Sequence, residues 1–334
     1  MVYMRLTAED ITNADEIDYY SLNKRNGFDA RSREESVRRY RTHKITRKII
    51  CWILGILVGV VLAIGTLLSG IYMGPLNKSV VFRSLHDSDY YANTLEYFYE
   101  SSYDLTLPSG LPVDVLADAV TLEQVQKDVN GYIESCFDGS QYYFDTSSLK
   151  DSVRKASVKY MKEKYPTQVN VDNSKMIDAF VREVSTQYES TISVTVFVYI
   201  GSFHNMLQNI VPVVALFAVM ILVAVCFLVA KLHTYFHRGL RYAAYGTLSA
   251  MIMTGVVPAI LLIIKPYLKL GISPDFFNKF VMIYIHNSLW VLIYSSMVLL
   301  VISIFLILVI NILRTRLIMG FGRTRTKAEV IVNR

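Results

Sequence analysis

The chain has 334 residues, of which 53% are hydrophobic and 19% are charged, and its formal net charge is +6. A soluble domain of this length is rarely so apolar, so the composition points away from the soluble globular class. Of the three cysteines, Cys51 and Cys226 fall in apolar segments and only Cys136 does not. This distribution excludes a disulfide-stapled secreted scaffold.

Four apolar segments are long enough to be transmembrane helices, since crossing about 30 Å of hydrocarbon takes roughly 20 residues. We expect these helices at 49–73, 208–230, 242–264 and 285–313, and none of these ranges contains Asp, Glu, Lys or Arg. The first begins too late and is too long for a cleaved signal peptide, so it is interpreted as an uncleaved anchor. The sequence therefore predicts an all-α integral membrane protein.

The positions of the basic residues predict the orientation, because cytoplasmic flanks of transmembrane helices are enriched in Lys and Arg. Eleven basic residues lie in 1–48, three in the 231–241 loop and six in the 314–334 tail. The long 74–207 segment carries eleven basic and eighteen acidic side chains, a net charge of −7. We expect both termini in the cytoplasm of a multi-pass plasma-membrane protein, with 74–207 and the 265–284 loop outside. Because the positive charge lies next to the apolar segments, a nucleic-acid partner is not expected.

A dense basic cluster precedes the first apolar segment. Basic residues beside a membrane attract anionic headgroups by about 1 kcal/mol each. The cluster is therefore predicted to contact anionic lipid at the cytoplasmic face, although its plainer role is to set the topology. It consists of Arg38, Arg39, Arg41, Lys44, Arg47 and Lys48.

The 74–207 segment has helical periodicity, which predicts an extracytoplasmic α-helical domain inserted between the first and second transmembrane helices. One helix is expected to start near Ser84 and to break at 107–112, where two prolines and a glycine occur. A second is expected to start at Thr121 with a capping-box pattern and to end at 138–139. Two more are expected over 148–165 and from about Asn173. The β-branched run in 191–207 is compatible with strand or helix, and a helix continuing toward 208 is favoured.

Small residues recur at helical spacing in two of the apolar segments and predict close helix packing in the membrane. Gly55, Gly59 and Ala63 form one such stripe, and Gly246 and Ala250 form another. Packing within the chain's own bundle is favoured over the alternative, homodimerisation.

Three groups of residues have the chemistry of a metal or functional site. The four-residue spacing of His233 and His237 suits a shared metal ion, but no further ligand is near in the sequence. The segment 86–89, with one His and two Asp, fits an acidic helix N-terminus better than a metal site. His286 and Asn287 are expected near the outer membrane interface, beside the aromatic residues Tyr284 and Trp290. No metal site or cofactor is predicted.

No catalytic signature is present, since the sequence lacks nucleophile-elbow, zincin, phosphate-loop, dinucleotide-binding and kinase patterns. The leading hypothesis is a non-enzymatic accessory or sensing protein of the bacterial cell envelope, whose outer domain binds a protein, a peptide or an envelope component. The alternative is a subunit of a small transporter or channel, which would need a polar path supplied by an oligomer or partner. A membrane enzyme that uses outer carboxylates is a third hypothesis.

Overall fold

The computed structural model describes residues 30–109, 111–112, 114–117, 119–164, 171–232 and 236–332. In these residues every regular element is a helix. The elements are α2 (Ala30–Met73), α3 (Lys78–Asp87), α4 (Tyr90–Ser109), α5 (Asp114–Ala117), α6 (Leu122–Asp138), α7 (Ser147–Lys164), α8 (Val171–Ile192), α9 (Thr195–Leu232), α10 (Phe236–Ile264), the 3-10 turn η1 (Pro266–Lys269) and α11 (Asp275–Val332).

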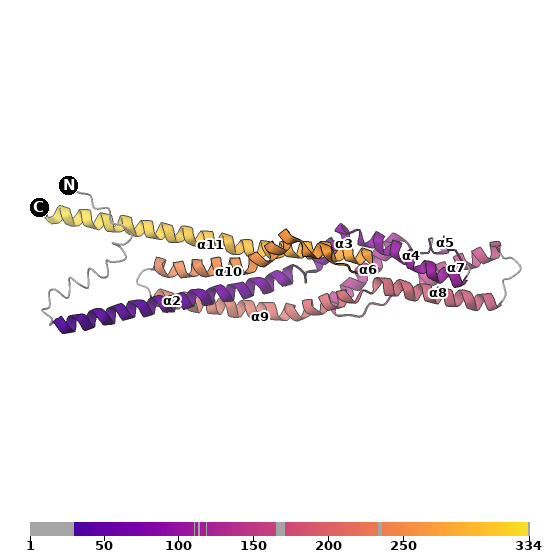
Figure 1. Cartoon of the computed structure of the whole chain (residues 1–334), viewed down its shortest axis with the longest axis horizontal. Helices are drawn as coiled ribbons and strands as arrows, with labels where there is room; N and C mark the ends of the chain where they lie inside the picture. The colour runs from indigo at the N-terminus through magenta and orange to yellow at the C-terminus, as the bar shows by residue number, and fades with distance from the viewer. Residues whose placement is uncertain are drawn as a thin grey trace.

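Four helices contain stretches long and apolar enough to cross a membrane, namely Ile49–Met73, Thr195–Val225, Leu240–Ile264 and Asp275–Thr315. They belong to α2, α9, α10 and α11, which run side by side in one elongated bundle (Figure 1). The first stretch has 25 residues, a length of about 37 Å at 1.5 Å per residue. The chain is thus a multi-pass membrane protein by the length and composition of its helices.

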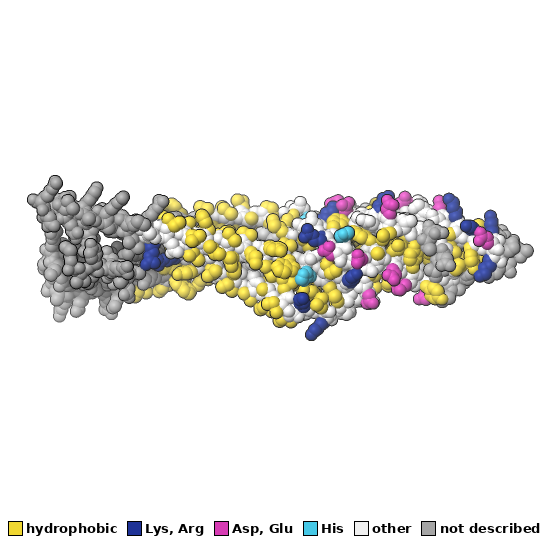
Figure 2. All heavy atoms as spheres, turned by 90° about the horizontal axis from the view of Figure 1, so that it is seen from above, with side chains coloured by type: hydrophobic (Ala, Val, Ile, Leu, Met, Phe, Trp, Pro, Cys, Tyr) yellow, Lys and Arg dark blue, Asp and Glu magenta, His cyan; other side chains and the backbone are white. Residues whose placement is uncertain are grey.

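The remaining helices, α3 to α8, form a polar head at one end of the bundle together with the first turns of α9 and α11 (Figure 1). The surface of the molecule changes character where the head begins (Figure 2). Hydrophobic side chains cover the bundle, whereas acidic and basic side chains are spread over the head. Such a division is what a membrane-embedded part and a water-exposed part require.

The core of the head continues without a gap into the ends of the apolar helices. Tyr90 of α4 is fully buried and packs its ring edge-to-face against Phe197 of α9 and Phe276 of α11. Phe280, one turn further along α11, contacts both Tyr90 and Phe197. Aromatic pairs of this kind add about 0.5–1.5 kcal/mol each beyond burial of their area. The head is therefore packed onto the bundle and not tethered to it by a linker.

The turn between α2 and α3 is fixed by side chains from two other helices. The ring of His204 on α9 stacks on Tyr72, and its Nδ1 lies 2.7 Å from the Leu76 carbonyl oxygen. The Tyr284 hydroxyl on α11 donates a hydrogen bond to the Pro75 carbonyl. These contacts give hydrogen-bond partners to two backbone carbonyls of the turn itself.

Helix α9 passes close to α6 at Gly201. A Cβ atom at this position would lie 2.1 Å from the Cys136 carbonyl oxygen, which is backbone and cannot move aside. A glycine is needed here because no other residue lets the two backbones approach so closely. The contact fixes α6 of the head against α9.

Several predicted helices are confirmed. Helix α6 is capped at its start by the Thr121 hydroxyl, which accepts a hydrogen bond from the Gln124 amide, and at its end by Gly139 in the left-handed conformation. Helix α7 spans 147–164, close to the predicted 148–165, and α8 begins at 171, near the predicted Asn173.

Some of the predicted helix boundaries were wrong. A break at 88–89, where Asp89 has a φ of 52°, divides the expected first helix of the domain into α3 and α4. The break expected over 107–112 does occur, although the helix continues through Pro108 and ends only at Ser109. Helix is correct for the β-branched run, but residues 193–194 interrupt it between α8 and α9.

Two apolar helices start well before the expected transmembrane helices. Helix α9 begins at Thr195, where 208 was expected, and α11 begins at Asp275, where a loop was expected up to 284. The added turns are more polar than the membrane segments, but they bury Phe197, Phe276 and Phe280 in the head. Tertiary packing therefore extends these helices toward their N-termini, where hydropathy alone would start them later.

Candidate ligand cleft between α3 and α11

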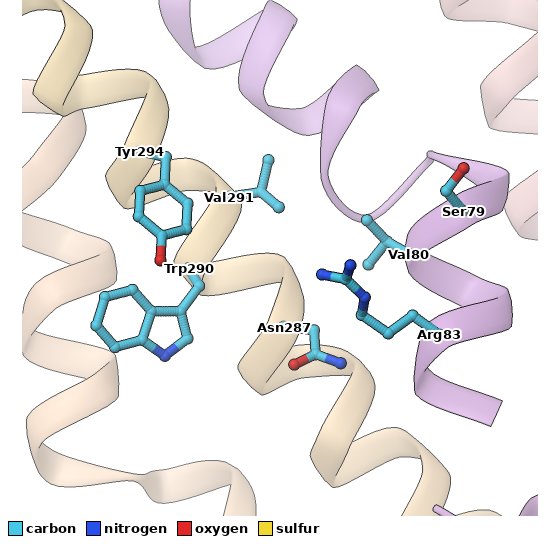
Figure 3. Close-up of a pocket in the computed structure, with 7 residues that line it drawn as sticks. All are labelled: Ser79, Val80, Arg83, Asn287, Trp290, Val291 and Tyr294. Atoms are coloured by element: carbon cyan, nitrogen blue, oxygen red, sulfur yellow. The ribbon is translucent and has the colours of Figure 1, made fainter. Parts of the chain in front are cut away.

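A cleft of about 380 Å³ opens between α3 and α11, where the apolar bundle meets the head (Figure 3). Its size is within the range of small-molecule sites. One wall comes from the first turns of α3 and the other from α11. The lining residues are Ser79, Val80, Arg83, Asn287, Trp290, Val291 and Tyr294.

The position of α3 follows from its cap and its apolar face. The Asn77 side chain accepts a hydrogen bond of 2.8 Å from the Ser79 amide and starts the helix directly after the turn that follows α2. Val81 and Leu85 are completely buried in the head. Because α3 buries this face, it directs Val80 and Arg83 toward α11 (Figure 3).

Arg83 supplies the positive charge of the cleft. Its side chain is exposed and extends into the space in front of Asn287 (Figure 3). Arg83 makes no ion pair with any residue that the structure describes. Its guanidinium group therefore keeps five N–H donors for a phosphate or a carboxylate.

Asn287 ties α11 to α3 at the floor of the cleft. Its Nδ2 donates hydrogen bonds to the Ser84 hydroxyl at 3.1 Å and to the Asp87 carboxylate at 3.4 Å. Asp87 is thus turned toward Asn287, one helical turn beyond Arg83. These bonds hold the two walls at a fixed separation.

The aromatic wall is held by a chain of hydrogen bonds. The Trp290 Nε1–H donates to His286 Nε2 at 3.1 Å, and His286 Nδ1 lies 2.9 Å from the Tyr267 hydroxyl. Since Nε2 accepts, a neutral His286 carries its proton on Nδ1 and donates it to Tyr267. The indole is therefore oriented by a contact that reaches from α11 to η1, and Tyr294 packs beside it with ring centroids 5.7 Å apart.

This arrangement suits an amphiphilic ligand with a negatively charged group. The guanidinium, the Asn287 amide and the Ser79 hydroxyl lie on the polar side, whereas Val291, Trp290 and Tyr294 form an apolar side that continues along α11. Trp and Tyr at the border between apolar and polar surfaces are typical of membrane interfaces. In the described residues no group of three or more His, Cys, Asp or Glu is placed to hold a metal ion.

The structure brings the small residues of α2 and α10 together in a close seam. A Cβ atom at Gly246 would lie 2.8 Å from the Gly55 carbonyl oxygen and 3.2 Å from the Gly59 nitrogen. Ala63 and Ala250 are buried further along the same seam. All of these contacts lie within one chain.

The other sequence candidates do not converge on the cleft. The basic cluster over 38–48 belongs to α2, at the end of the bundle away from the head (Figure 1), and its side chains are outside the described part of the structure. His233 also lies outside it, as does the side chain of His237. Asp87 is at the C-terminal end of α3, so the interpretation of the 86–89 segment as an acidic helix start is wrong for this residue.

The sequence reasoning missed Arg83 and Ser79, because it placed the first helix of the domain near Ser84. The Asn77 cap and the amphipathic pattern of 78–87 are the signals that indicate α3. His286 and Asn287 were expected at a membrane interface, and the structure adds their contacts with Tyr267, Ser84 and Asp87. Comparison with protein-family models, curated proteins and solved structures gives no match for this chain.

Proposed function

We propose that this chain is a non-enzymatic accessory or sensing protein of the bacterial plasma membrane. In this proposal its head, within residues 74–207, lies outside the cell and both termini lie in the cytoplasm. The distribution of charge supports this orientation, because the basic clusters flank the apolar segments at the end of the bundle away from the head. The head would bind a component of the envelope, and the bundle would anchor it and report its state.

The observation that carries the proposal is the shared core of head and bundle. Helices α9 and α11 run without interruption from the head into the apolar zone, and Phe197 and Phe280 are completely buried between them and α4. A simple anchor needs only a flexible linker. A packed junction lets binding at the head shift the apolar helices, because interiors at native density transmit small displacements.

The ligand class follows from the cleft. An anionic amphiphile would place its phosphate or carboxylate on Arg83 and its apolar part along Trp290, Val291 and Tyr294. A hydrogen bond to a charged group contributes about 1.5–3 kcal/mol, which gives the anion a measurable preference over a neutral or zwitterionic headgroup. The same phosphate chemistry is available from a lipid headgroup or from free phosphate, and an experiment separates these sources.

Trp290 provides a direct reporter of the cleft. The chain has two tryptophans, so W52F leaves Trp290 as the only one. The full-length W52F protein in phosphatidylcholine nanodiscs would be titrated with water-soluble short-chain phosphatidylglycerol, short-chain phosphatidylcholine and inorganic phosphate. We expect phosphatidylglycerol to produce a saturable change in the fluorescence emission of Trp290 and phosphatidylcholine to produce none.

A charge-neutral variant tests the role of Arg83. In the W52F background, R83Q is expected to weaken binding of phosphatidylglycerol about tenfold or more, since it removes a charged hydrogen-bond donor. The matched control is R182Q, which neutralises an exposed arginine on α8. If inorganic phosphate is the one ligand that saturates the Trp290 signal, the cleft is an anion site for a soluble ligand and not for a lipid. Equal responses to both lipids, or unchanged affinity in R83Q, would overturn the proposal.

A further inference from the structure

Helix α7 differs in charge from the rest of the head. Its eighteen residues carry six basic and two acidic side chains, a net charge of +4, whereas the whole 74–207 segment has a net charge of −7. Helix α7 also lies at the end of the head that is distant from the apolar bundle (Figure 1). Positive charge is therefore concentrated on one helix at the tip of an otherwise acidic domain.

Three lysines of α7 form an open basic face. Lys155, Lys159 and Lys162 are exposed and line a shallow depression of about 590 Å³ on the helix surface, together with Arg154, Val158 and one acidic residue, Glu163. The three lysines make no ion pair with any residue in the described part of the chain. By contrast, Arg154 is bonded to Asp178 at 2.6 Å and Lys164 to the Tyr160 hydroxyl at 2.7 Å.

The spacing of these lysines repeats along one side of the helix. Residues 155, 159 and 162 are four and three positions apart, so their charges follow each other at about one helical turn, 5.4 Å. We propose that this face binds a linear phosphate-rich polyanion at the tip of the head. The proposal goes beyond the function assigned to the cleft and does not depend on it.

The chemistry of the face favours a phosphate polymer over a folded protein partner. Protein interfaces usually depend on a few buried aromatic or aliphatic anchors, but in the described residues of α7 no large hydrophobic side chain is strongly exposed. The one arginine near the lysines, Arg154, is bonded to Asp178, so the binding charge of the face comes from lysine ammonium groups and not from a guanidinium fork. Lysine ammonium groups bind phosphate as point charges, without a demand for one geometry.

Binding by charge alone has a characteristic salt dependence. If the three lysines each contact one phosphate, the slope of log K against log salt is about −2 to −3. Raising NaCl from 50 to 200 mM is then expected to weaken binding roughly twenty- to fifty-fold.

The test uses the full-length protein in phosphatidylcholine nanodiscs and fluorescently labelled long-chain inorganic polyphosphate. Affinity would be measured by thermophoresis at 50 and 200 mM NaCl. The test variant is K155E/K159E, and the matched control is K127E/R182E, which makes the same change in net charge on α6 and α8. Far-UV circular dichroism verifies that both variants keep their helix content.

We expect K155E/K159E to lose at least tenfold in affinity and the control to stay within about threefold of the parent protein. Labelled polyglutamate of equal charge is expected to bind at least tenfold more weakly than polyphosphate. Equal losses in the two variants, equal binding of polyglutamate, or no salt dependence would each overturn the proposal. Binding in the cleft is measured separately through Trp290 fluorescence. A negative result with polyphosphate therefore does not affect the test of the cleft.

Discussion

The Tyr188 hydroxyl on α8 donates a hydrogen bond of 2.7 Å to the Asp128 carboxylate on α6, although the two residues are sixty positions apart. Asp128 is only 7% exposed, and the Tyr142 hydroxyl donates a second bond to it at 3.0 Å. Two phenols thus stabilise an acidic side chain in the interior of the head and join α6, α8 and the segment between α6 and α7.

Removing one of these phenols is expected to destabilise the head. Y188F leaves the buried Asp128 with one donor fewer, and an unsatisfied buried partner costs about 1–3 kcal/mol, more when it is charged. Thermal unfolding followed by far-UV circular dichroism would measure the loss. The control is Y143F, because Tyr143 is 78% exposed and, among the described residues, its hydroxyl bonds only to Gln141. An equal fall in melting temperature in both variants would contradict the stabilising role of the Tyr188–Asp128 hydrogen bond.

The same contacts predict a loss of stability at high pH. Burial, together with the neighbouring Asp128 carboxylate, raises the pKa of Tyr142 from 10.0 to about 12, and burial likewise raises the pKa of Tyr188. The folded protein holds these protons more tightly than the unfolded chain, so the contribution is fully present below pH 10 and is lost as pH rises toward 12. Melting temperatures at pH 9, 10 and 11 should therefore fall, and less steeply in Y142F. A flat profile above pH 10 would show that these phenols do not link protonation to folding.

Gly246 is expected to tolerate no larger residue. In G246A the new methyl group meets the Gly55 carbonyl at 2.8 Å, so α2 and α10 must separate, and overpacking of this kind costs about 1–3 kcal/mol. The matched control is G65A on α2, where no atom lies within 4 Å of the added Cβ. G65A is expected to be neutral or up to about 1 kcal/mol more stable because alanine favours helix. The melting temperatures of both variants in the same detergent check this prediction. An unchanged melting temperature in G246A would refute the tight contact between α2 and α10.

The proposed orientation predicts which residues can be reached from outside the cell. In a background without native cysteines, K150C on the head should react with a membrane-impermeant maleimide on intact cells. R325C should react only after the membrane is permeabilised. The reverse pattern would place the head in the cytoplasm and remove the basis for an envelope ligand.

The sequence alone predicted what depends on local signals. The apolar segment expected at 49–73 lies within α2, which ends at Met73, and the Thr121 cap and the Gly139 stop of α6 were both recognised. These features are set by hydropathy and by side chains within a few positions of the helix ends, so they need no knowledge of tertiary contacts.

Features that arise from distant contacts were not predicted. The cleft joins residues near 80 with residues near 290, and no spacing rule connects segments 200 positions apart. The early starts of α9 and α11 depend on burial of Phe197 and Phe276 in the head, which outweighs the polar residues around them. The break at Asp89 requires a positive φ, which Asp adopts more often than most residues, but no sequence pattern indicates at which aspartate this happens.

Helix α11 links the cleft directly to the opposite surface of the bundle. From Phe280, in the core of the head, to Arg314, near the end of the apolar stretch, it is an unbroken helix of about 51 Å. If the helix tilted by only about 5° about its end in the head, its other end would move by about 4 Å over such a length. A ligand that tilts α11 beside Trp290 would therefore move the far end of the same helix, and α10 and α2, which pack against α11, would have to accommodate that movement.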